Sequence, residues 1–110
     1  MLFYRNILFQ QVAKQAKQSL RKVSKEQYAA IKVLIESGNI TMLNEIFTQT
    51  GIKRTNFSKD MGMNYQTFTY RLKRPASFSY EESFTIAHLI GVKKEVVAQL
   101  IIAQSESNRK

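Results

Sequence analysis

Hydrophobic residues recur at helical spacing along most of the chain, and short polar or glycine-containing stretches separate the resulting segments. The first segment covers residues 2–23, and its apolar positions share one helix face: Phe9, Ala13, Ala16, Leu20 and Val23. A basic stripe runs beside that face and consists of Lys14, Lys17, Arg21 and Lys25. The pattern predicts an amphipathic helix, whose basic side is either a solvated face or an arm that lies along phosphates.

The later helices are marked by their ends. Ser24 and Ser79 each stand three residues before a Gln or a Glu, which is the capping-box spacing that starts a helix. Glycines 38, 51 and 91 are placed to end helices in a left-handed conformation. Because the chain has one proline and four glycines, an all-α protein is expected. The predicted helices cover residues 25–37, 41–50, 55–61, 65–74, 80–90 and 94–103, followed by a polar, flexible tail at 104–110.

The segment 54–74 has the residues that two helices need in order to cross over a short turn. Ser58 is small where the first helix would pass closest to the second, and Gly62, four residues later, can adopt the positive φ of the turn. Apolar residues are available to fill the wedge between the helices: Phe57, Met61, Met63, Phe68 and Leu72. Asn64 is a good N-cap for the second helix. The pattern predicts a helix-turn-helix, with its first helix at about 54–61 and its second at about 65–74.

This segment resembles the helix-turn-helix of the Cro and phage-repressor family, the lambda-repressor-like group of xenobiotic-response-element type. The likeness extends over residues 41–103, because residues 42–49 resemble the leading helix of the family and residues 84–92 resemble its fourth helix and the turn after it. Ser58 stands where the family usually has Ala, and Arg54 stands where a residue, often Gln, commonly contacts phosphate.

The resemblance implies a compact helical bundle of lambda-repressor-like type at residues 39–103, with residues 1–38 as an added N-terminal helical extension packed on the core. It also implies sequence-specific binding of double-stranded DNA. The chain departs from the family in one spacing, since Phe68 and Leu72 are four residues apart where the family more often has three. A slight rotation of the recognition helix is therefore expected.

The charge of the chain is strongly positive. Seventeen Lys and Arg stand against eight Asp and Glu, which gives a net charge of +9. Between positions 53 and 74 the single acid, Asp60, faces six bases: Lys53, Arg54, Lys59, Arg71, Lys73 and Arg74. From residue 81 onward acids and bases balance. Such a distribution favours a polyanionic partner at the predicted helix-turn-helix.

A recognition helix presents its N-terminal residues to base edges in the major groove, while the preceding helix contacts the phosphate backbone. The residues expected to contact bases are Asn64, Tyr65, Gln66, Thr69, Tyr70 and Lys73. Gln66 suits a bidentate pair with adenine, Thr69 suits a thymine methyl group, and Lys73 suits guanine or a phosphate. Partial burial is the alternative for the two tyrosines. The residues expected to contact phosphates are Lys53, Arg54, Thr55, Lys59, Arg71 and Arg74.

Catalytic and metal chemistry find little support in the sequence. The chain has no cysteine, and its one histidine, His88, lies in an apolar helical run where a partly buried side chain is expected. We expect no enzyme, no metal, no cofactor and no small-molecule substrate. The apolar start is interrupted by Arg5, Asn6 and Gln10, and no stretch approaches the ~20 apolar residues of a membrane span. A cytoplasmic protein without a membrane partner is expected.

The leading hypothesis is a transcriptional regulator that binds a near-palindromic site as a homodimer. The dimer contact would come from Val97, Ile101 and Ile102, or from the apolar segment 2–8. A helical protein-interaction module, antitoxin-like or adaptor-like and without DNA binding, is the first alternative. RNA binding ranks last, because no aromatic platform for base stacking is evident.

Overall fold

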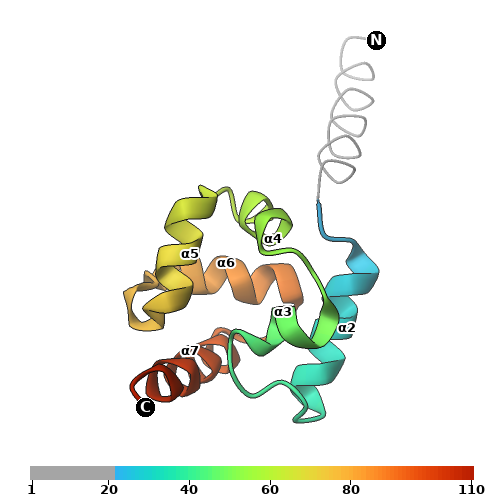
Figure 1. Ribbon diagram of the computed structural model, residues 1–110. Helices are drawn as coiled ribbons and strands as arrows, with labels where there is room; N and C mark the ends of the chain where they lie inside the picture. Colours follow the sequence, from blue (N-terminus) through green and yellow to red (C-terminus); the bar gives the residue numbers. More distant parts are fainter. Residues whose placement is uncertain (1–21) are drawn as a thin grey trace, which may run out of the picture.

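The computed structural model describes residues 22–110, and every regular element in that range is helical (Figure 1). The elements are α2 (Lys25–Glu36), α3 (Glu45–Thr50), α4 (Arg54–Asp60), α5 (Tyr65–Lys73), η1 (Pro75–Ser77), α6 (Tyr80–Ile90) and α7 (Lys94–Asn108). The all-α prediction is confirmed for this part of the chain. The amphipathic helix predicted at 2–23 lies almost wholly outside the described residues.

The predicted helix starts are confirmed by their hydrogen bonds. The Ser24 hydroxyl accepts the Gln27 amide at 3.1 Å, and the Gln27 side chain accepts the Ser24 amide at 3.0 Å. Ser79 and Glu82 form the same reciprocal pair ahead of α6. The Asn64 side chain accepts the Gln66 amide at 2.7 Å and caps α5. Local capping patterns therefore set where these three helices begin.

The helix α3 begins later than predicted. Glu45 Oε1 accepts the backbone amides of Thr41 and Met42 at 2.8 and 2.9 Å, and also the Thr41 hydroxyl at 3.0 Å. These bonds hold residues 41–44 in a turn, so the helix starts at Glu45 and not at Thr41. The hydrogen bond from the Thr41 amide is the main reason why the pKa of the Glu45 carboxyl lies below its ordinary value, against a smaller opposing effect of burial.

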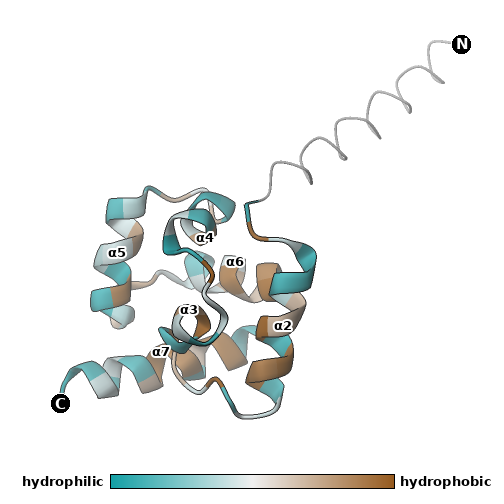
Figure 2. Cartoon of the chain, turned by 45° about the vertical axis from the view of Figure 1, so that its right-hand side comes forward, coloured by the Kyte–Doolittle hydropathy of each residue, from teal (hydrophilic) through white to brown (hydrophobic). Residues whose placement is uncertain are grey.

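The core is centred on three phenylalanines from α3, α4 and α5. The Phe57 and Phe68 rings stack with 5.8 Å between centroids, and Phe47 meets Phe57 edge-on at 5.4 Å. Phe57, Phe68 and Leu72 are buried, while Met61 and Met63 pack against them partly buried, as the predicted wedge requires. Figure 2 shows hydrophobic residues on α2, α3 and α6, and α6 packs against both α2 and α7. The aromatic core fixes α4 and α5 to the rest of the bundle.

The last helix, α7, is longer than predicted, and its C-terminal end is hydrogen-bonded to the rest of the bundle. It runs to Asn108, whereas the sequence placed a flexible tail from residue 104 onward. Gln104 is only 5% exposed, and its Oε1 accepts the Asn44 backbone amide at 2.9 Å. Its Nε2 donates to Asn108 Oδ1 at 2.9 Å, and Asn108 in turn donates to the Lys73 carbonyl at 3.3 Å. These hydrogen bonds link the start of α3 to the end of α7, and the end of α7 to the end of α5. The prediction of a flexible tail from residue 104 is therefore wrong at least as far as Asn108.

Candidate nucleic-acid interface

The helices α4 and α5 are joined by a four-residue turn, residues 61–64, at the upper left of Figure 1. Gly62 has φ +69°, and its amide donates to the Lys59 carbonyl at 3.0 Å. Ser58 is 1% exposed, and the Met63 amide donates to its carbonyl at 2.9 Å. Both positions that the crossing restricts, the small residue and the left-handed glycine, are therefore where the sequence placed them.

The outer face of α5 carries most of the side chains predicted to contact bases. Phe68 and Leu72 are buried on its inner face. Asn64, Gln66 and Lys73 are exposed, and the two tyrosines, Tyr65 and Tyr70, are 46% and 49% exposed. The partial burial considered for the tyrosines is thus limited to about half of each side chain. Within residues 22–110 the Gln66 side chain makes no hydrogen bond, whereas the Asn64 oxygen is used in capping the helix.

Two residues of α5 are placed differently from the sequence analysis. Thr69 is partly buried beside the inner face, and its Oγ1 is shielded from solvent. Thr67 is exposed and was missed. At 100° per residue Thr67 lies 60° around the helix from Tyr70 on the outward side, so a helical wheel centred on Phe68 and Leu72 would have found it.

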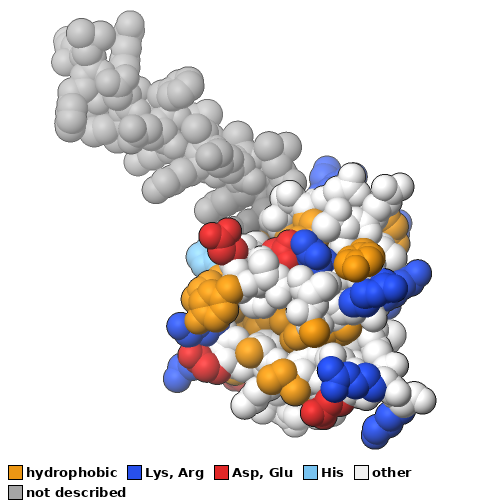
Figure 3. Space-filling view, turned by 90° about the vertical axis from the view of Figure 1, so that its left-hand side faces the viewer, with side chains coloured by type: hydrophobic (Ala, Val, Ile, Leu, Met, Phe, Trp, Pro, Cys, Tyr) orange, Lys and Arg blue, Asp and Glu red, His pale blue; other side chains and the backbone are white. Residues whose placement is uncertain are grey.

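Three of the six predicted phosphate-contacting residues are exposed cations, and none of these three has an acidic partner among the described residues. Lys53, Thr55, Lys59 and Arg74 are exposed, and Arg54 is partly buried. The Arg54 guanidinium carbon lies 5.0 Å from the Phe47 ring centroid, and that of Arg74 lies 4.7 Å from the Tyr70 centroid. Among the residues that the structure describes, none of these four basic residues forms an ion pair. Figure 3, which faces the α5 side of the molecule, shows several Lys and Arg side chains along its right-hand side and others at its left edge.

Arg71 differs from the other predicted phosphate-contacting residues. Its Nε lies 3.0 Å from Glu82 Oε1, and the two side chains are 27% and 21% exposed. Its charge is therefore compensated inside the protein, and its geometry does not support the predicted role at a phosphate.

The single acid of the segment, Asp60, has a structural role. Its carboxylate accepts the backbone amides of Lys22 and Val23 at 2.7 and 3.0 Å, and the Tyr28 hydroxyl at 2.6 Å. The negative charge is held by the start of α2 and by Tyr28. Asp60 forms no ion pair with the cations of α4 and α5 within residues 22–110.

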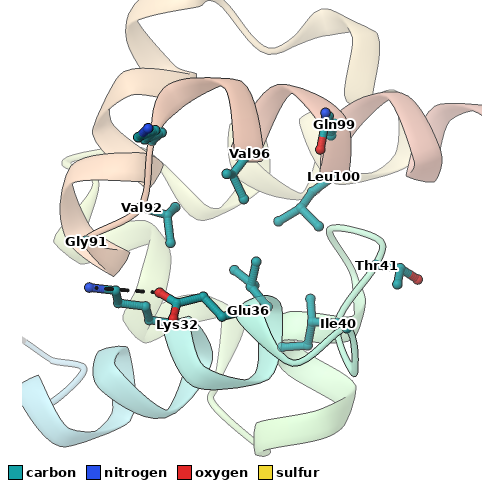
Figure 4. Close-up of a pocket in the computed structure, with 12 residues that line it drawn as sticks. Lys32, Glu36, Ile40, Thr41, Gly91, Val92, Val96, Gln99 and Leu100 are labelled. Atoms are coloured by element: carbon teal, nitrogen blue, oxygen red, sulfur yellow. Dashed lines mark ion pairs between the residues drawn. The ribbon is translucent and has the colours of Figure 1, made fainter.

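The remaining predicted features concern metal binding, the one histidine and membrane spans. No group of three or more His, Cys, Asp or Glu side chains is arranged to hold a metal ion there. His88 is exposed on α6, which corrects the expected partial burial. None of the helices in residues 22–110 combines the length and apolar character needed to cross a membrane. A depression of about 620 Å³ lies between α2 and α7, away from α5, and apolar side chains including Val92, Val96 and Leu100 line it (Figure 4).

Comparisons of the chain with protein-family models, with curated proteins and with solved structures found no match.

Proposed function

We propose that this chain is a sequence-specific DNA-binding transcriptional regulator of phage-repressor type, which places α5 in the major groove. The observation that carries the proposal is the division of α5 into two faces. Phe68 and Leu72 anchor the inner face in the core, while Gln66 and Tyr70 present polar groups outward. A major groove about 12 Å wide admits one helix, and an unpaired amide such as that of Gln66 suits the edge of an adenine.

The charge around this helix supports the same function. Lys53 and Lys59 on the α4 side, and Arg74 at the end of α5, are exposed and make no ion pair in the described part of the chain. Cations on the helix that precedes a recognition helix are placed to contact phosphates, and these contacts set the orientation on the duplex. Their charge also accelerates the encounter with DNA.

The regulator acts as a homodimer in this proposal, because one recognition helix reads few base pairs. Of the residues considered for the dimer contact, Val97 is 0% exposed and belongs to the core. Ile102 is 57% exposed and Ile101 is partly exposed beside it, so the middle of α7 is the better candidate among the described residues. The apolar segment 2–8 lies outside them.

Selection of bound sequences from a random duplex pool, with and without competitor RNA, tests the proposal. We expect one enriched motif with two related half-sites about 10 base pairs apart, and no competition from RNA. The helical interaction module predicts no enrichment at all, and equal competition by RNA would favour the RNA-binding alternative. Either result would overturn the proposed function.

A further inference from the structure

A second depression, of about 480 Å³, lies where α5 meets α3, α4 and the end of α7. Its lining combines two basic residues with three polar residues and one leucine, and contains no acid: Asn44, Arg54, Thr69, Leu72, Lys73 and Asn108. We call it the α5 depression. It adjoins the predicted DNA-binding face, because Lys73 belongs to both.

The two basic residues place uncompensated positive charge in the α5 depression. Arg54 is held in position by its stacking on Phe47, and Lys73 is exposed at the last turn of α5. Neither forms an ion pair with any residue of the range 22–110. Two like charges that line one site repel each other, and a bound anion would relieve that repulsion and attract both.

A buried hydroxyl in the same lining lacks a partner. Thr69 Oγ1 is the one buried side-chain oxygen or nitrogen within residues 22–110 that makes no hydrogen bond. Buried polar atoms are nearly always paired, so an orphan at the edge of a depression points to a group that completes it. A helical threonine occupies two staggered χ1 positions, which allows its hydroxyl to turn toward a ligand.

Two amide side chains complete the set of donors. Asn44 makes no side-chain capping bond at the start of α3, so its amide group is available. One N–H of the Asn108 side-chain amide donates to the Lys73 carbonyl, and its second N–H is available to a ligand. Guanidinium, ammonium, hydroxyl and amide donors together match the oxygens of a phosphate group, which accepts hydrogen bonds from several directions.

We infer that the α5 depression is a phosphate-binding site. The ligand is a phosphate group, supplied either by the backbone of duplex DNA or by a free phosphate; only the first source rests on the proposed function. In this inference Thr69 contacts a phosphate and not a base edge, and Lys73 contacts the same phosphate.

The direct test is a titration of the protein with inorganic phosphate at constant ionic strength, in which the positions of the amide NMR signals are the readout. We expect saturable shifts at Thr69 and Lys73 and at the side-chain amides of Asn44 and Asn108. Lys73→Gln should weaken phosphate binding about tenfold or more, and Thr69→Val about threefold to tenfold. Lys93→Gln removes an equal charge from an exposed position outside the lining and outside the predicted interface, and should bind phosphate like the unmodified chain.

Shifts that do not saturate, or equal weakening in Lys93→Gln and Lys73→Gln, would show that only bulk charge acts and would overturn the site. Folding does not obscure the result, because valine has nearly the same shape as threonine and Thr69→Val removes an unpaired buried hydroxyl. Its melting temperature should equal or exceed that of the unmodified chain while its phosphate affinity falls.

Adding the duplex from the selection experiment distinguishes the two sources. Displacement of bound phosphate by the duplex identifies the DNA backbone as the ligand, whereas binding of the duplex without displacement leaves free phosphate as the ligand. A protein that binds phosphate but no duplex would overturn the proposed function and retain the site. A protein that binds duplex but no phosphate would overturn the site and retain the proposed function.

Discussion

Arg71 on α5 and Glu82 on α6 form an ion pair, with 3.0 Å between Nε and Oε1, and the same carboxylate oxygen accepts the Ser79 amide at 2.7 Å. Glu82 thus caps its own helix and holds the neighbouring one. Since both side chains are largely shielded, the pair orients α5 against α6 and uses the charge of Arg71 for that purpose. Arg74, three residues later, is exposed and has no acidic partner among the described residues.

The first prediction separates these two arginines. Arg71→Met should lower the free energy of unfolding by about 1 kcal/mol, because it breaks a partly exposed, charge-assisted hydrogen bond. It should leave the dependence of DNA affinity on salt unchanged. Arg74→Met should barely affect stability and should reduce the slope of log affinity against log salt by about one unit for a lost phosphate contact. Urea unfolding measures the stability of each variant, and DNA binding at several salt concentrations measures the slope. A reduced slope in Arg71→Met would show that Arg71 contacts a phosphate after all.

The second prediction concerns base recognition by Gln66. Gln66→Ala should cost about 1–3 kcal/mol in binding to the selected duplex, because a bidentate contact to an adenine is lost. Binding to unrelated duplexes should stay nearly constant, since phosphate contacts supply it. Gln99→Ala, at an exposed position on α7, is the matched control. An equal loss on all duplexes would contradict a base-reading role for Gln66.

The third prediction tests the turn between α4 and α5. A Cβ added to Gly62 would meet nothing within 4 Å, so any cost of substitution there comes from the backbone and not from a clash. At φ +69° Gly62→Val should destabilise the protein by roughly 1–2 kcal/mol or more, because a β-branched residue resists the left-handed region. Gly62→Asn should cost less, since Asn tolerates this conformation. Thermal unfolding compares the two, and equal melting temperatures for Val and Asn would argue against this account of the turn.

Local features of the fold were predictable from the sequence, because each depends on a few neighbouring residues. Ser24, Ser79 and Asn64 cap helices by bonding amides two or three residues ahead, and Gly62 supplies a conformation that other residues avoid. The alternation of apolar and polar positions was enough to assign Phe68 and Leu72 to the core and Gln66 to the surface.

Features that depend on distant residues were not predictable. The pairing of Arg71 with Glu82 joins residues eleven positions apart, and that of Asn44 with Gln104 joins residues sixty apart. Composition made residues 104–110 resemble a solvated tail, because a buried glutamine is indistinguishable from an exposed one until its partner is known. The burial of Thr69 likewise follows from how α5 lies against α3, α4 and α7, which helix periodicity does not give.

The fourth prediction is a pH dependence that comes from Glu45. Its pKa is lowered in the folded protein, mainly by the Thr41 amide, so the ionised form stabilises the fold. This contribution is fully present above the unfolded-state value and is lost as the pH falls through the folded-state pKa. Glu45→Gln should therefore be less stable than the unmodified chain at neutral pH, and the difference should shrink in acid. Urea midpoints across pH measure it, with Glu106→Gln as an exposed control; a difference that stays constant into acid would contradict the role of Glu45.

The fifth prediction concerns Gln104, whose side chain joins the start of α3 to the end of α7. Gln104→Ala leaves the Asn44 amide without its partner and releases Asn108, so it should lower the free energy of unfolding by about 1–3 kcal/mol. Gln99→Ala makes the same change of side chain on the same helix at an exposed position, and should be nearly neutral. Because Asn108 also donates to the Lys73 carbonyl, Gln104→Ala should in addition increase amide hydrogen exchange at the last turn of α5. Equal melting temperatures for the two variants would mean that the hydrogen-bonded chain does not hold the end of α5 in place.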